Sequence, residues 1–435
     1  MSQRAHDWTI SVLGSAMLLA ASVLSGCGGG SGDGGSGQGP TTPPSGVTPS
    51  PPAVAQAKAE NTPVDPALVA ANNTFGLNLL NTLIQAGPNT NIAISPTSVA
   101  MALQIAYNGA AGTTQTAMAQ TLQLGSLSQV SQLNNDNAAL LAALLDPDPQ
   151  VTLTIANSLW VPLSGATVSS TFASADQTYY GATLGDLAQA PADINAWGNT
   201  QTNGLIPQIL PPDTNLTQAK AILANVVYFK GSWQSGFSPT QTQPAPFTLA
   251  DGTQTTVNMM EQAQATFPVI SGTNFTAISL PYGQGRLSMI LVLPNSGLDL
   301  GTFISTLTPA DIDSWVTQMY SGTVNLFLPR FTTSFSANLI PPLTTLGMGI
   351  AFEAGGGDFS GIYPGAYISA VQHDTVVEVD ETGTVAAGST TVVIGPTVAQ
   401  VPVNLDFNRP FFYTIRDNQT GALLFTGVMV NPNGG

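Results

Sequence analysis

The sequence has few charged residues and few of the side chains that hold metals. Only 7% of its 435 residues are charged, and 24 acidic against 8 basic side chains give a net charge of -16. Eight scattered basic residues do not form the patch that nucleic-acid binding requires, so a nucleic-acid partner is excluded. One cysteine and two histidines are too few for a zinc, haem or iron–sulfur site, so we expect no metal and no cofactor.

The N-terminal segment also lacks an apolar run long enough for a membrane span. The stretch from Met17 to Leu24 is shorter than the roughly 20 residues that a span needs, and it predicts a signal peptide over residues 1–26. Residues 24–27 read Leu-Ser-Gly-Cys and resemble the bacterial lipobox, in which the cysteine is lipidated. We therefore expect a lipid anchor on Cys27, the only cysteine. Gly28 rather than Asp follows it, which favours the outer membrane of a bacterial cell envelope, facing the periplasm or the exterior.

Residues 27–63 have the composition of a tether. From Gly28 to Pro52, 15 of 25 residues are Gly or Pro. Such a segment buries too little apolar surface to offset the entropy lost on ordering, so it predicts disorder. No comparable break and no internal repeat follows, and residues 64–435 are expected to form one domain.

Helical and strand patterns occupy different parts of this domain. Apolar residues recur at helical spacing over Asp65–Ala86 and Ser98–Ala106. Later apolar or alternating runs predict strands, and this order favours an α+β fold. The predicted strands are Val151–Trp160, Ala221–Lys230, Leu287–Leu293, Val324–Phe331, Thr375–Asp380 and Leu423–Val430.

Six motifs, taken in order, resemble those of the serpin family across residues 64–435. The resemblance implies three β-sheets, eight or nine helices and an exposed reactive-centre loop that inserts into the largest sheet after a protease cleaves it. The motifs are Asn91–Ser98, Ile194–Trp197 followed by Thr202–Ile206, Asn225–Trp233, Leu328–Phe331, Glu381–Gly388, and Phe407–Phe411 leading to Gly427–Pro432.

The segment Glu381–Ser389 matches the hinge of that loop. From Thr384 onward it contains small, uncharged residues, and no proline occurs before Pro396. A strand that enters a sheet must donate its backbone N–H groups and place small side chains in a packed interior, so this composition favours insertion over an ordinary flexible loop. The hinge residues are Glu381, Gly383, Thr384, Ala386, Ala387 and Gly388.

The family's usual distance from the hinge glutamate places the scissile bond at Thr397-Val398. Val398-Ala399 and Ala399-Gln400 remain alternatives. In each case the residue before the bond is small and uncharged, so a trypsin-like pocket would keep an unpaired acid. Serine proteases of the elastase or subtilisin type are the expected targets.

Polar residues elsewhere match two further family clusters. His373 is the only histidine after the signal peptide, but no Gly-x-Ser-x-Gly elbow supports a catalytic triad, so no catalytic residue is expected. An isolated core histidine is the plainer alternative. The resemblance assigns Ser95, Ser98, Asn225 and His373 to the shutter under the large sheet, and Trp233, Arg330 and Glu381 to the breach at its top.

Two functions remain open at this point. The favoured one is a suicide inhibitor of serine proteases, which is not an enzyme; the alternative is a non-inhibitory surface or binding protein whose loop is only a substrate. The hinge composition favours inhibition. Heparin-activated serpins use a basic helix, but Leu124–Leu145 contains no Lys or Arg, so no polyanion partner is expected. We expect a monomer.

Overall fold

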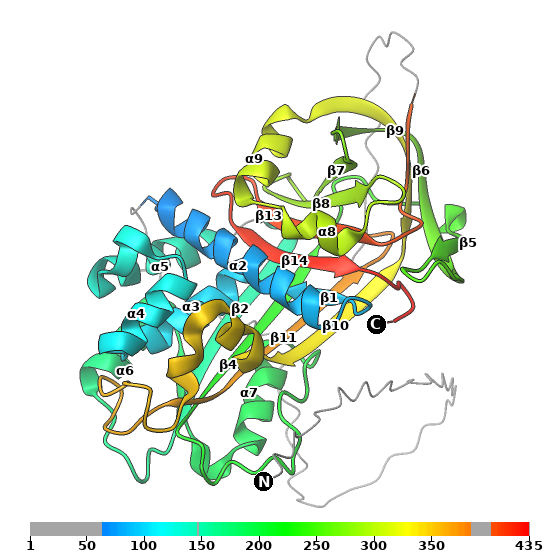
Figure 1. The fold of residues 1–435 in the computed structure, drawn as a ribbon. Coiled ribbons are helices and arrows are strands. Elements are labelled where there is room, and N and C mark those ends of the chain that lie inside the picture. The colour runs from blue at the N-terminus through cyan, green and yellow to red at the C-terminus, as the bar shows by residue number, and fades with distance from the viewer. Residues whose placement is uncertain (1–62, 146–147, 384–401, 435) are drawn as a thin grey trace, which may run out of the picture. The chain divides into compact units, whose positions relative to one another are not determined.

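The computed structural model describes residues 63–145, 148–383 and 402–434 (Figure 1). Cys27, the hinge residues after Gly383 and all three candidate scissile bonds lie outside these ranges. The described residues belong to one compact unit.

The described part contains nine α-helices, and the first begins close to where the sequence predicts. The Asp65 side chain accepts a hydrogen bond of 2.8 Å from the N–H of Ala67, and Pro66 occupies the first helical position, as is typical of a helix start. The helices are α2 (Pro66–Ala86), α3 (Pro96–Tyr107), α4 (Gly112–Thr121), α5 (Val130–Leu144), α6 (Ser170–Tyr180), α7 (Ala192–Gln201), α8 (Leu300–Ser305), α9 (Pro309–Gln318) and α10 (Ile340–Leu343).

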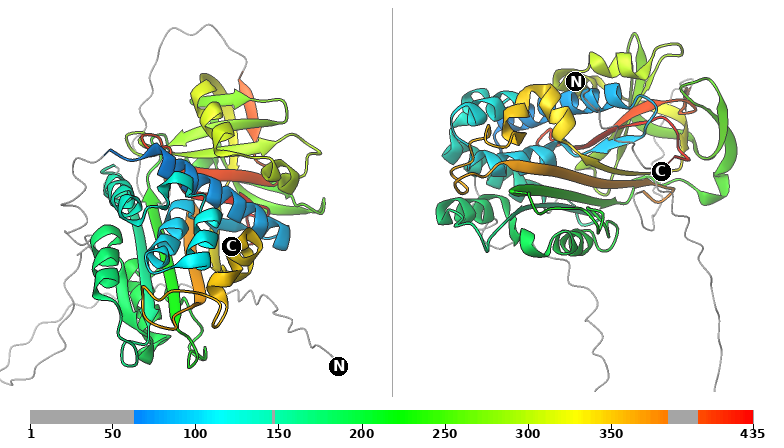
Figure 2. Two further views of the ribbon diagram at one scale, coloured as in Figure 1. Left: turned by 60° about the vertical axis from the view of Figure 1, so that its left-hand side comes forward. Right: turned by 60° about the horizontal axis from the view of Figure 1, so that its bottom comes forward.

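A five-stranded sheet lies between two helical layers (Figure 2). One face packs against α3 in the main hydrophobic core, and the other packs against α7 through a smaller cluster that includes Ile194 and Val226. The strands, in spatial order, are β10 (Phe331–Asn338), β11 (Ile368–Val379), β4 (Ala221–Gly231), β2 (Val151–Val161) and β3 (Thr183–Asp186).

The remaining strands form one nine-stranded hydrogen-bonded sheet, where the resemblance implies two separate sheets. The cause is β6 (Gln254–Ser271), an 18-residue strand that pairs with β9 along most of its length and with β7 at its end. A register shift lies between Gln262 and Ala265, where Gln264 has a positive φ of 51°. The other strands are β1 (Ile92–Ile94), β5 (Gln243–Thr248), β7 (Phe275–Pro281), β8 (Leu287–Pro294), β9 (Tyr320–Pro329), β12 (Val403–Asp406), β13 (Phe411–Asp417) and β14 (Leu423–Met429).

The predicted α+β class is confirmed, with two differences in the strands. The apolar run from Val324 to Phe331 belongs to two strands, because β9 ends at Pro329 and β10 starts after Arg330. Strand β11 begins at Ile368, earlier than predicted, because its polar residues Gln372, His373 and Asp374 are buried inside the sheet and hide the strand pattern.

Candidate functional site at the seam of the five-stranded sheet

The five-stranded sheet contains a parallel pair between antiparallel neighbours. Strands β4 and β11 run in the same direction, whereas β10–β11 and β2–β4 are antiparallel. We call the β4–β11 pairing the seam; it runs from Ala221 opposite Ile368 to Tyr228 opposite Val376, and each strand continues three residues further. A new strand of opposite direction placed in the seam would be antiparallel to both neighbours.

A buried polar cluster holds the middle of the seam together. His373 of β11 and Asn225 of β4 are opposite each other in register, and the His373 Nδ1 lies 2.6 Å from the Asn225 Oδ1. The N–H of Ser95, which caps α3, donates to the His373 Nε2 at 3.1 Å. The Asn225 amide also donates to the Ser98 hydroxyl. The structure thus brings together all four residues that the resemblance assigns to the shutter.

The hydrogen bonds fix the protonation state of His373. Because its Nε2 accepts from a backbone N–H, the ring proton is on Nδ1, which donates to Asn225. Burial lowers the pKa of His373 from 6.5 to about 3, so the imidazole is neutral at ordinary pH. A neutral ring with both nitrogens occupied has a structural role and is not poised to act as a base.

One member of this cluster was missed in the sequence. Asn157 of β2 lies opposite Asn225, and its Oδ1 accepts from the Asn225 amide at 2.6 Å. The only signal was an asparagine within the strand Val151–Val161, whose other polar residues are Thr152, Thr154 and Ser158. Its partner depends on the register between β2 and β4, which the sequence does not reveal.

The top of the seam carries a bidentate ion pair. Arg330 Nη2 contacts both carboxylate oxygens of Glu381 at 2.5 and 2.6 Å, and the Thr242 hydroxyl donates to one of them at 2.5 Å. Burial alone raises the pKa of Glu381, but the hydrogen bonds from Thr242 and Arg330 outweigh it and lower the pKa. The side chain of Glu381 is 5% exposed and that of Arg330 46% exposed, so the pair fixes the position of Glu381 more than it stabilises the fold. Thr242 was not predicted.

Trp233 connects the end of β4 with the end of β11. Its ring N–H donates to the carbonyl of Asp380 at 2.9 Å, and its ring stacks on Tyr282 with centroids 4.4 Å apart. Its backbone N–H donates to the carbonyl of Thr382 at 3.0 Å. The chain that leaves β11 is therefore held against the end of β4.

Gly383 occupies the opening of the seam. It forms one antiparallel bridge to Asp380, which follows β11, and a second to Ser232, which follows β4. Its φ of 132° and its close approach to Gly231 and Trp233 leave no room for a Cβ atom. The last described residue before the gap thus already lies between the two strands, in the direction opposite to both.

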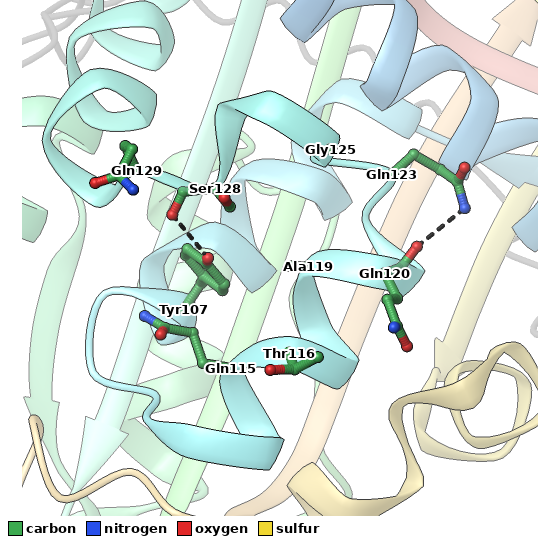
Figure 3. Close-up of a pocket in the computed structure, with 9 residues that line it drawn as sticks. All are labelled: Tyr107, Gln115, Thr116, Ala119, Gln120, Gln123, Gly125, Ser128 and Gln129. Atoms are coloured by element: carbon green, nitrogen blue, oxygen red, sulfur yellow. Dashed lines mark hydrogen bonds between the residues drawn. The ribbon is translucent and has the colours of Figure 1, made fainter.

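A surface pocket of about 600 Å³ lies between α4 and residues 123–129, which lead into α5 (Figure 3). Its floor includes Tyr107, whose hydroxyl donates to the carbonyl of Ser128 at 2.9 Å. None of its lining side chains is charged, so it offers no ion pair to a sulfated polyanion. The lining residues are Tyr107, Gln115, Thr116, Ala119, Gln120, Gln123, Gly125, Ser128 and Gln129.

The described residues show no arrangement for a metal or a membrane span. Within residues 63–145, 148–383 and 402–434, no three His, Cys, Asp or Glu side chains are grouped so that they could hold a metal ion. Over the same ranges, none of the helices combines the length and the apolar character needed to cross a bilayer.

Comparison with known proteins identifies the family. The model of the family "Serpin (serine protease inhibitor)" matches residues 70–432. The horse (Equus caballus) leukocyte elastase inhibitor is 32% identical over 382 residues, covering 84% of this chain and 99% of its own. The native crystal structure of tengpin, a thermophilic serpin, is 28% identical with a TM-score of 0.76, covering 85% of this chain and 95% of its own. Human thyroxine-binding globulin, solved in complex with thyroxine, is 25% identical with a TM-score of 0.75, covering 84% of this chain and 98% of its own. The chain therefore belongs to the serpin family of serine protease inhibitors.

Proposed function

We propose that this protein is a suicide inhibitor of serine proteases that acts by inserting its cleaved loop into the seam. The protease serine oxygen attacks the carbonyl carbon of the residue before the scissile bond, the peptide bond breaks, and the departing amine takes a proton. The resulting ester links protease and inhibitor. Insertion then carries the protease along the sheet and distorts its catalytic site before water hydrolyses the ester.

The position of Gly383 is the observation that carries this proposal. Its two antiparallel bridges put the start of a new strand between β4 and β11. Extending the bridge to Asp380 in the same register would place Thr384 opposite Val379 and Ala386 opposite Val377, both of which are fully buried. Small uncharged side chains suit those positions, and the hinge sequence supplies them.

Incubation with pancreatic elastase or subtilisin tests the proposed function. We expect a complex that survives boiling in detergent and whose mass equals the protease plus the inhibitor without its C-terminal fragment. The alternative is a non-inhibitory protein of the same fold, a possibility in keeping with the thyroxine-binding relative. Complete cleavage of the loop with full recovery of protease activity would support that alternative.

We propose elastase-like or subtilisin-like enzymes as the target class. The small residues around Thr397, Val398 and Ala399 suit a shallow apolar pocket, and one relative is named as an inhibitor of leukocyte elastase.

Replacing the residue before the scissile bond should therefore change the target. The Thr397→Arg variant should lose inhibition of elastase and gain inhibition of trypsin, because the guanidinium pairs with the acid of a trypsin-like pocket. Second-order inhibition rates against both enzymes are the measurement. If only Val398→Arg or Ala399→Arg gains trypsin inhibition, the scissile bond lies one or two residues later.

We also propose that Cys27 anchors the protein to a bacterial envelope membrane. The Cys27→Ala variant should leave the membrane fraction and appear in the soluble fraction, because lipidation needs the thiol. Its far-ultraviolet circular dichroism should match that of the wild type. An unchanged amount of the variant in washed membranes would reject the lipid anchor.

A further inference from the structure

Asp374 is a buried carboxyl group at the seam that the sequence motifs did not single out. It follows His373 on β11 and is 3% exposed. Because side chains alternate along a strand, His373 faces α3 and Asp374 faces the α7 side of the sheet. Ser336 of β10, opposite in register, donates to this carboxyl group, but the Oδ2 atom has no partner among the described residues.

The neighbours of Asp374 provide no compensating positive charge. Val226 of β4 lies opposite it, and on its own strand it is flanked by Gln372 and Val376. Further along this face lie the titratable groups Glu378 and Tyr228, and the cation on it, Lys230, is four residues beyond Val226 near the end of β4. Residues 192–220, which begin with α7 and lie on this side of the sheet, carry Asp193, Asp213 and Lys220. No ion pair with Asp374 occurs within the described ranges.

Burial therefore shifts the pKa values of Asp374 and His373 in opposite directions. Burial raises the pKa of Asp374 from 3.8 to about 7, against a smaller opposing effect of the Ser336 hydrogen bond. Burial lowers the pKa of His373 from 6.5 to about 3. The geometry agrees, because the His373 Nε2 must accept a hydrogen bond and an ionised Asp374 would leave one oxygen without a donor.

These two shifts have opposite effects on the pH dependence of unfolding, which exposes both side chains to water. Between pH 3.8 and about 7, Asp374 holds a proton in the folded form and loses it on unfolding, so rising pH favours unfolding by about tenfold per pH unit. Between about pH 3 and 6.5, His373 excludes a proton in the folded form and binds one on unfolding, so rising pH disfavours unfolding by about tenfold per unit. The two effects cancel between pH 3.8 and 6.5.

We propose that His373 and Asp374 form an opposed titratable pair that keeps the stability of the closed β4–β11 seam nearly independent of pH under mildly acidic conditions. The consequence for inhibition rests on the proposed function, in which the loop enters this seam.

The Asp374→Asn variant of the full chain tests this pair. We expect its unfolding equilibrium constant, measured in urea, to rise roughly a hundredfold more than that of the wild type between pH 6.5 and 4.5, because only His373 then responds. At pH 7.5 the variant should be more stable than the wild type, since it removes a buried ionised carboxylate. Glu378→Gln, a change at an exposed residue on the same face of β11, should follow the wild type at every pH.

A second measurement reads His373 directly. Nitrogen chemical shifts of labelled histidine in the mature protein should show the neutral Nδ1–H form at pH 4.5. The proposal is overturned if Asp374→Asn keeps the wild-type pH profile or if His373 is protonated at that pH. Neither experiment involves a protease. A negative result here would therefore not affect the test for a covalent complex, and a negative result in that test would not affect this proposal.

Discussion

The Ala387→Pro variant should be cleaved by the target protease but should release it active. In the register extended from Gly383, Ala387 lies opposite Val376, at the last paired position of the seam. Proline has no N–H to donate there and cannot sit in the middle of a sheet. Insertion should stop before the protease is displaced, so roughly nine-tenths or more of the inhibitor should become cleaved product.

Two substitutions at Thr384 provide the matched comparison. Thr384→Arg would bring a charge beside the buried Val379, and it should also give a substrate. Thr384→Ser keeps a small side chain with a hydroxyl group, and it should still trap the protease. Covalent complexes of wild-type yield from Ala387→Pro and Thr384→Arg would exclude insertion of the hinge as the trapping step.

Cleavage within the loop should raise the melting temperature of the protein. Roughly a dozen additional backbone hydrogen bonds, at about 0.5–1.5 kcal/mol each, would stabilise the inserted form by on the order of 10 kcal/mol. For a domain of this size, that corresponds to a rise of on the order of 10–20 °C. Calorimetry of intact and cleaved protein at the same pH measures the difference.

An ordinary loop behaves differently when it is cut. A nick adds conformational freedom and no new contacts, so the melting temperature stays equal or falls. Cleaved Ala387→Pro is the control, and it should melt well below the cleaved wild type. A cleaved wild-type protein that melts no higher than the intact protein would favour the non-inhibitory alternative.

Much of the fold could be predicted because its signals are local. The apolar spacing over Asp65–Ala86 predicted α2 to within a residue, and the run from Val151 predicted β2. The joining of two expected sheets through β6 could not be predicted, because it depends on a register shift near Gln264 within one long strand.

In the candidate site, too, residues within local motifs could be predicted, whereas contacts between distant segments could not. Asn225 and His373 were named from motifs, but their partner Asn157 and the contact of Thr242 with Glu381 arise from strand register and from packing across distant segments. Asp374 was missed because an acidic residue in a strand usually faces solvent. Asp374 is buried because α7 and the residues around it pack on that face of the sheet.

The most direct test of the account is a crystal structure of the loop-cleaved protein. Asn225 and His373 are now adjacent partners, with Oδ1 and Nδ1 2.6 Å apart. We predict that residues from Thr384 onward form a new strand between β4 and β11, antiparallel to both. The backbones of Asn225 and His373 would then be two strand spacings apart, about 9.5 Å. A cleaved structure in which β4 and β11 remain paired, with Asn225 still opposite His373, would contradict the account.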